Sequence, residues 1–318
     1  MALTVPVLSK FPATARITCV SSGINLAYGQ VDGRLVIGED EISLSQINCM
    51  YEFPYGDLLV GTTESLQIFR DGKEISSSAH ETGIESISGK GDYAVCIDGL
   101  GRAHIVDSKG EETPINETSV LFAKVGHRIA IATESGSVST YSQGGIKLWE
   151  RPIRGDVGER ITAIGWNGNI LIVAREGHGL VPGDEEALEV EYWREGQLEN
   201  RFDVKRRVIA IEGPWMGLDM GGIMQNEVLV ADLSHPAHTI IDMGENALVG
   251  SWFPLHMVKP DGIVWSVETQ GMVEHVSSNG DGTAVLIAGS DQNDYTDAEP
   301  VVLIDSTSEP TLLVEEST

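Results

Sequence analysis

Short apolar segments typical of β-strands recur along the whole chain, and no segment with helical periodicity interrupts them. The clearest copy occupies residues 79–107, where the apolar run at 93–97 (YAVCI) is too short for a helix and suits a strand buried on both faces. Residues 98–101 (DGLG) favour a tight turn, because glycine tolerates positive φ and Asp bonds to its own backbone. This pattern predicts an all-β fold.

The strand-like segments form repeats. The segments that could open a repeat begin at Ile17, Ile47, Ile84, Leu121, Ile161, Val208, Leu248 and Met272. Most intervals are about 40 residues, the length that four strands and their turns need. The last interval, from Leu248 to Met272, is too short for four strands. We therefore favour seven repeats, with residues 248–270 in an enlarged neighbour, and keep eight as the alternative, with this stretch as a short repeat of its own.

These repeats resemble β-propellers of the WD-repeat and quinoprotein-like kind. Ala79-His80 stands where such repeats carry a Gly-His pair, and Asp98 where they carry the turn Asp. Residues 146–150 (IKLWE) look like the strand-ending Trp-Asp signature with Glu in place of Asp. The resemblance implies one propeller domain of four-stranded blades over residues 1–318.

We also expect the two ends of the chain to meet. The N-terminal run at residues 3–8 could join the last blade beside residues 301–305 and close the ring. Closure would leave only short, protected strand edges, whereas an open end exposes a template for pairing with other chains.

The chain is strongly acidic, with 21 basic and 48 acidic residues and a formal net charge of −27. Nonspecific binding of nucleic acid needs a basic surface, so this balance argues against it. An acidic excess with few lysines resembles the soluble proteins of salt-adapted organisms, which favours a solubility adaptation. An acidic face for a basic partner or for cations is the alternative.

The cysteines suggest a reducing compartment. Cys19, Cys49 and Cys96 include no Cys-x-x-Cys pair and each lies in an apolar run, which indicates neither a disulfide framework nor a zinc site. The N-terminus lacks a basic segment followed by a long apolar one, and no run approaches the roughly 20 apolar residues of a membrane helix. We therefore expect a cytoplasmic protein that does not enter a membrane.

Two basic clusters stand out against the acidic background. Arg151, Arg154 and Arg160 form one, and Lys205, Arg206 and Arg207 form the other; both fall at predicted connections between blades. Arginine is suited to bidentate recognition of a carboxylate or phosphate, so we predict that these residues contact an acidic partner. Salt bridges to nearby Asp and Glu are the ordinary alternative.

Large apolar residues gather in the second half of the chain. Trp215 and Trp252 are candidate anchors for a protein partner if they lie on a face of the ring. Met216, Phe253 and Trp265 belong to the same region. Filling the space between blades is the alternative for all of them.

Three other groupings carry weaker signals. His80 and Asp98 could hydrogen-bond within one blade, with an acid/base pair as the alternative. The acidic stretches at 183–186 and 291–299 lack the spacing of an EF-hand loop and suit solvated loops better than calcium sites. His235 and His238 are a weak hint of a metal, because Pro236 between them predicts a loop.

No catalytic motif is present: the sequence has no nucleophile elbow, P-loop, dinucleotide glycine motif or His-Glu-x-x-His. We therefore predict no catalytic residue, cofactor or metal, and favour a monomeric, noncatalytic scaffold for protein–protein interaction. The alternative is a propeller enzyme, or a binder of a small ligand or metal, with its site at the mouth of the central channel. Fold alone does not decide between them. Converging carboxylates and histidines at the channel mouth would favour the alternative, and an exposed Trp or Arg on a flat face would favour the scaffold.

Overall fold

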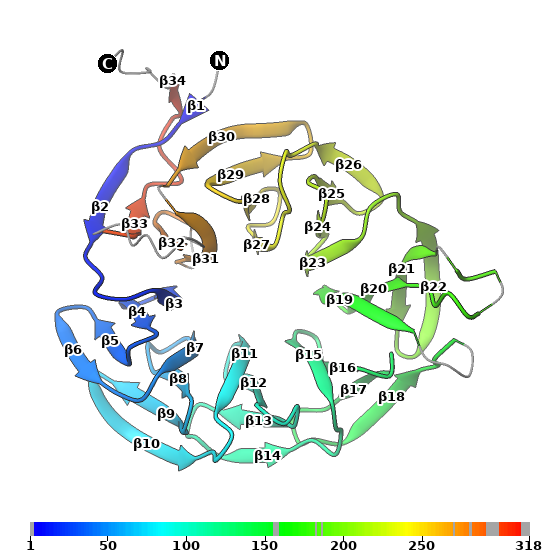
Figure 1. Ribbon diagram of the computed structural model, residues 1–318, viewed down its shortest axis with the longest axis horizontal. Helices are drawn as coiled ribbons and strands as arrows, with labels where there is room; N and C mark the ends of the chain where they lie inside the picture. Colours follow the sequence, from blue (N-terminus) through cyan, green and yellow to red (C-terminus); the bar gives the residue numbers. More distant parts are fainter. Residues whose placement is uncertain are drawn as a thin grey trace.

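The computed structural model describes residues 3–154, 159–181, 183–185, 187–269, 271–279, 282–290 and 299–312. Over these ranges the chain forms strands, turns and loops and contains no helix. The described strands build eight four-stranded antiparallel sheets, which Figure 1 shows as blades arranged in a ring. The chain is therefore an all-β propeller, as the repeat pattern predicted. Among the described residues there is no helix that could span a membrane.

Blades 1 to 7 are meanders of four consecutive strands, blade 8 combines three consecutive strands with one from the N-terminus, and in every blade the first strand lies nearest the centre of the ring (Figure 1). From blade 1 to blade 8 these first strands are β3 (Ile17–Ser22), β7 (Ile47–Glu52), β11 (Ile84–Lys90), β15 (Val120–Val125), β19 (Arg160–Asn167), β23 (Val208–Glu212), β27 (Thr239–Asp242) and β31 (Met272–Ser278). The second strands are β4 (Leu26–Gln30), β8 (Leu58–Thr62), β12 (Tyr93–Asp98), β16 (Ile129–Thr133), β20 (Ile170–Glu176), β24 (Trp215–Leu218), β28 (Ala247–Gly250) and β32 (Val285–Ser290).

The third and outermost strands complete the blades. The third strands are β5 (Arg34–Ile37), β9 (Ser65–Arg70), β13 (Ala103–Asp107), β17 (Val138–Tyr141), β21 (Leu188–Arg194), β25 (Ile223–Gln225), β29 (Pro254–Lys259) and β33 (Val301–Ile304). The outermost strands are β6 (Asp40–Ser43), β10 (Lys73–Ala79), β14 (Glu112–Pro114), β18 (Lys147–Arg151), β22 (Gln197–Asp203), β26 (Val228–Ala231), β30 (Gly262–Glu268) and, in blade 8, β2 (Val7–Phe11).

The number of blades is eight, the second of the two counts that the sequence allowed, rather than the favoured seven. Blade 7 opens with β27 at Thr239, and Leu248 lies in its second strand, β28. β27 has only four residues, with one buried side chain, so its pattern is weak in the sequence. The sequence prediction took Leu248, in the second strand of blade 7, as the start of that blade. The predicted start was therefore one strand too late, and the interval to Met272 was too short for four strands.

The N-terminal segment closes the ring, as predicted. β2 is the outermost strand of blade 8 and pairs antiparallel with β33, with Phe11 opposite Val301 and Val7 opposite Ile304. The closing strand covers residues 7–11 rather than 3–8. The preceding strand β1 (Leu3–Thr4) forms a separate pair with β34 (Thr311–Leu312), near both chain ends in Figure 1.

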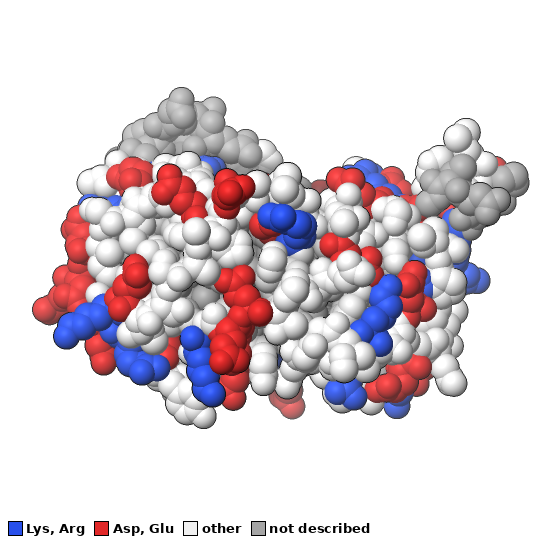
Figure 2. All heavy atoms as spheres, turned by 90° about the horizontal axis from the view of Figure 1, so that it is seen from below, with Lys and Arg blue, Asp and Glu red and all other residues white. Residues whose placement is uncertain are grey.

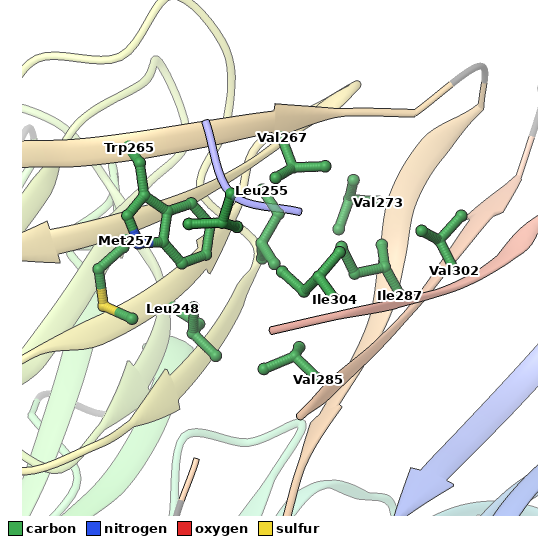
Figure 3. Close-up of a cluster of buried hydrophobic side chains, with 11 residues drawn as sticks. Leu248, Leu255, Met257, Trp265, Val267, Val273, Val285, Ile287, Val302 and Ile304 are labelled. Carbon is green, nitrogen blue, oxygen red and sulfur yellow. The ribbon is translucent and has the colours of Figure 1, made fainter. Parts of the chain in front are cut away.

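The core is divided into eight hydrophobic clusters, one at each interface between neighbouring blades. Figure 3 shows the cluster between blades 7 and 8, where Trp265 and Met257 of blade 7 lie on one side and Val285 and Ile287 of blade 8 lie near them. Trp265 is therefore a core residue, the second of the two roles considered for it. This packing makes each blade depend on both neighbours for burial of its apolar surface.

The antiparallel meander divides the loops between two faces. We call the face that carries the second-to-third-strand loops and the blade-to-blade connections the upper face, and the opposite one the lower face. Around the outside of the ring, the side drawn in Figure 2 carries many acidic side chains with basic ones among them.

Candidate functional site

The first predicted basic cluster is largely an internal ion-pair network. Arg151 ends β18 and is only 1% exposed. Its guanidinium donates to Glu159, just before β19, at 2.6 Å and to Glu191 in β21 at 2.5 Å. Arg154 pairs with Glu191 at 2.8 Å and also with Glu189. The burial of Arg151 removes it from any surface that a partner could reach, and these contacts correspond to the salt-bridge alternative.

The same network extends to a second buried arginine that the sequence reading passed over. Arg175 in β20 is fully enclosed and lies 3.1 Å from carboxylate oxygens of both Glu159 and Glu189. It also pairs with Asp184, which is 8% exposed. Asp184 was expected in a solvated acidic loop, and it is instead the buried residue that attaches this loop to blade 5. A signal was available, since an Arg that directly follows the apolar run of residues 170–174 in the same strand needs an acidic partner if it is buried.

The network is suited to holding blades together rather than to chemistry. Burial opposes the charge of Arg151, but hydrogen bonds to Glu159 and Glu191 outweigh it and raise the pKa of Arg151 above its ordinary value. Burial likewise opposes the charge of Glu191, but the bond from Arg151 lowers the pKa of this carboxyl. Both groups therefore remain charged and bonded to each other at neutral pH, and neither is poised to move a proton.

The second predicted cluster lies on the upper face, in the connection between β22 and β23. Arg206 donates to the carbonyl oxygen of Gly221 and to Asp232, both at 2.6 Å. Arg207 pairs with Glu176 at 2.9 Å. Lys205 is exposed and forms no ion pair within the part of the chain that the structure describes.

The arginines of this cluster stabilise two neighbouring loops. Gly221 lies in the loop between β24 and β25, and Glu176 ends β20 at the start of the loop that leads to β21. Met220, beside Gly221, is 74% exposed, and Leu180 in the other loop is 77% exposed. Sequence reasoning missed both apolar residues, although each adjoins a glycine. Arg206 thus contacts the loop that presents Met220 to solvent, and Arg207 contacts the strand end from which the loop bearing Leu180 begins.

The two candidate tryptophans have opposite environments. Trp215 in β24 is fully buried and belongs to the cluster between blades 6 and 7, so that it cannot contact a partner in this structure. Trp252 lies on the upper face in the loop between β28 and β29 and is 37% exposed. Its neighbour Phe253 is 41% exposed.

Trp252 has a backbone conformation that is unusual for a bulky residue. Its φ is 54°, in the left-handed region, which costs an L-residue roughly 1–2 kcal/mol. The carbonyl of Trp252 accepts a hydrogen bond from the Val273 amide at 2.7 Å, and Phe253 accepts one from the Thr269 amide at 3.2 Å. The Trp252 ring packs on His235, with ring centroids 4.3 Å apart. Such strain is maintained by the surrounding structure, and it is common at binding sites.

We use the name upper-face patch for five exposed residues in the upper-face loops and connections of blades 5, 6 and 7. Its members all lie in loops or connections of the upper face and combine large apolar groups with a single free cation; they are Leu180, Lys205, Met220, Trp252 and Phe253. Exposed aromatic and apolar side chains of this kind are typical of protein-binding surfaces.

The opposite half of the ring has a different feature. A cavity of about 530 Å³ opens on the upper face among the inner strands of blades 8, 1, 2 and 3. Glu85, Glu274 and His275 line it together with Arg16. Within the described ranges, no group of three or more His, Cys, Asp or Glu residues has the arrangement of a metal site. The ring thus carries both an exposed Trp on its face and carboxylates near a histidine at the channel mouth.

The remaining sequence candidates are structural. Asp98 does not bond to His80; it accepts from the backbone and side chain of Arg102 in its own turn, and is fully buried. His80 instead approaches Glu112 of the next blade at 3.2 Å. The hydrogen bond expected between His80 and Asp98 is therefore absent. Asp98 bonds within its own turn, and His80 connects blades 2 and 3.

The two histidines at 235 and 238 do not converge. His235 packs on Trp252, whereas His238 approaches the carbonyl oxygen of Val273 at 3.0 Å. The acidic stretch at 291–299 lies outside the described residues except for Glu299. The three cysteines are free and buried, and burial raises the pKa of the Cys19 thiol to about 12.

Comparisons with known proteins support the fold alone. No family model matches the chain, and no curated protein matches it in sequence. The structure is similar to the computationally designed Ika8 protein, with a TM-score of 0.68 and 14% identity over 95% of this chain and 99% of that chain. It is similar to BamB from Moraxella catarrhalis, with a TM-score of 0.66 and 12% identity over 95% and 97%. The WD40 repeats of RRP9 give a TM-score of 0.62 and 9% identity over 95% and 99%. The resemblance to WD-repeat and quinoprotein-like propellers is confirmed at the level of structure.

Proposed function

We propose that this protein is a noncatalytic scaffold that binds another protein through the upper-face patch. The proposal rests on Trp252. This large apolar side chain is exposed to solvent, and its backbone is strained. Tryptophan is the residue type most enriched among side chains that dominate binding energy. A rigid anchor also loses little conformational entropy when a partner binds, because its loop is already bonded to the connection between blades 7 and 8.

The chemistry of the patch indicates what it would bind. The apolar side chains of Leu180, Met220, Trp252 and Phe253 fit an apolar segment of the partner. Lys205 would then pair with a carboxylate beside that segment. Arg206 and Arg207 act indirectly in this proposal, by stabilising the loops that carry Met220 and Leu180. Arg154 is 28% exposed and lies within the ion-pair network, so its contribution would be at the edge of the patch.

The WD40 repeats of RRP9 share this propeller fold, and the scaffold proposal itself rests on Trp252. We further propose that the chain acts as one domain and as a monomer in a reducing cytoplasm, where three buried free thiols would persist. The acidic excess would then be an adaptation for solubility.

Affinity capture with matched surface variants tests the proposal. The full chain would be immobilised as wild type, as Trp252→Ala and as Tyr55→Ala, and incubated with extract of the native organism. Tyr55 is a suitable control because it is 78% exposed but lies on the lower face, between β7 and β8. We expect a protein that is retained by the wild type and by Tyr55→Ala and lost with Trp252→Ala, at unchanged melting temperature. Equal retention by all three proteins would refute the proposal.

A further inference from the structure

The cavity at the channel mouth is distinct from the upper-face patch. Its walls come from blades 8, 1, 2 and 3, whereas the patch lies on blades 5, 6 and 7, in the other half of the ring (Figure 1). Its volume of about 530 Å³ falls within the range of small-ligand pockets, about 300–1,000 Å³.

Side chains of both charges line this cavity without neutralising one another. Arg16 lies in the connection between blades 8 and 1 and has no ion pair within the described part of the chain. Glu85, at the start of β11, likewise has no cationic partner among the described residues. Glu274 in β31 lies 3.9 Å from His275 and has no lysine or arginine partner there. Arg16, Glu85 and Glu274 therefore line one cavity with no ion pair to any lysine, arginine or carboxylate partner among the described residues except the Glu274–His275 contact.

Neutral groups of the cavity are already oriented. The Asn48 side chain donates to the carbonyl oxygen of Ile84 at 2.9 Å and accepts from Gln46 at 3.1 Å. These two bonds determine the orientation of the Asn48 amide and leave the side-chain oxygen of Gln46 free to accept another bond. Burial lowers the pKa of His275, with Arg16 nearby contributing in the same direction, so the imidazole is neutral at pH 7 and can donate or accept a hydrogen bond.

From these contacts we infer that the channel mouth binds a small zwitterion of the amino-acid type. Arg16 would take the carboxylate of the ligand as a bidentate pair, and Glu85, across the cavity in blade 3, would take its ammonium group. A simple anion would meet the two glutamates, and a simple cation would meet the arginine, so only a ligand carrying both charges matches the cavity. Asn48 and Gln46 supply polar contacts between the two ends. This site does not depend on the proposed scaffold function.

Calorimetric titration of the full chain tests the inference. The first probe is a pool of the common L-amino acids, followed by its members one at a time, and the comparison probes are propionate and propylamine, which each carry one of the two charges. We expect binding of at least one amino acid and binding at least about tenfold weaker for both comparison probes. Absence of binding for the pool and for every member, or equal binding of propylamine or propionate, would overturn the inference.

Paired variants distinguish the cavity from the rest of the surface. Arg16→Gln and Glu85→Gln should each weaken amino-acid binding by about tenfold or more, since each removes a charged contact. Arg128→Gln and Glu111→Gln change the same residue types in lower-face loops, and should bind as the wild type does. Trp252→Ala should also bind normally, which separates this site from the upper-face patch. Unchanged affinity in both cavity variants would refute the assignment.

Discussion

The indole ring of Trp252 packs against the imidazole of His235, with ring centroids 4.3 Å apart and planes inclined by 55°. The two residues belong to different connections of the upper face, one within blade 7 and the other between blades 6 and 7. Their contact holds an exposed aromatic side chain in place while its backbone remains in the left-handed region. A large apolar group is thereby presented to solvent in one defined orientation.

The strain at Trp252 can be measured by comparing two truncations. Trp252→Gly and Trp252→Ala both remove the ring, but only glycine adopts a φ of 54° without steric cost. We expect the glycine variant to be more stable than the alanine variant by about 1 kcal/mol in urea unfolding. Phe253, which has no positive φ, is the control: there glycine should be no more stable than alanine. A more stable Trp252→Ala than Trp252→Gly would contradict this account.

The buried network predicts a large effect at Arg175. Replacing it with methionine removes the cationic partner of Asp184 and one of the arginine partners of both Glu159 and Glu189 in a buried region, and should cost about 3–5 kcal/mol of unfolding free energy. Adding Asp184→Asn should recover part of this loss, because one uncompensated charge is removed.

The control for this network is the exposed pair between Arg194 and Glu199. Arg194→Met should cost less than about 1 kcal/mol, as exposed ion pairs do. Similar losses of unfolding free energy for Arg175→Met and Arg194→Met would show that the buried network is not a stabilising link between blades 4 and 5.

Burial of His256 predicts a dependence of stability on pH. Desolvation lowers the pKa of this histidine from 6.5 to about 4, so the unfolded chain binds a proton more tightly than the folded one. The stabilisation is complete above pH 6.5 and is lost as the pH falls toward 4. This shift corresponds to about 3 kcal/mol.

The measurement is the unfolding free energy of wild type and His256→Asn across this range. The wild type should lose stability more steeply than the variant between pH 6.5 and 4. Parallel curves of unfolding free energy against pH for wild type and His256→Asn would contradict the claim that folding opposes protonation of His256.

The acidic excess predicts a response to salt. A net charge of −27 destabilises the compact ring through self-repulsion, which added salt screens. If the charge is an adaptation to a salt-rich cytoplasm, the unfolding free energy should rise with sodium chloride into the molar range. A flat response would contradict that interpretation of the composition.

The ring was predictable because each strand is marked by a short apolar run within its own few residues. Apolar runs near Ile17, Ile47 and Ile84 begin inner strands, and the run near Val301 pairs with the N-terminal strand. The boundary of blade 7 was missed because β27 is short. That displacement also placed Trp252 in a strand, whereas it lies in the loop after β28.

The candidate site was less predictable because exposure depends on contacts distant in the sequence. Arg151 looked like a surface cation until its partner Glu191, forty residues away, placed it in a buried network. Trp215 and Trp252 are the same residue type in similar apolar stretches, and only the blade assignment separates core from surface. The unpaired Arg16 of the cavity gives no sequence signal, since its neighbours come from three other blades.

The most direct test of the scaffold proposal is site-specific photocrosslinking in the native organism. A photoactivatable amino acid would replace Met220 on the upper face in one version of the chain and Tyr55 on the lower face in another. We predict that the version labelled at Met220 crosslinks to one discrete partner, and that Trp252→Ala abolishes this product. Crosslinking from Tyr55 alone, or a Met220 product that is unaffected by Trp252→Ala, would contradict the assignment of the partner site to the upper-face patch.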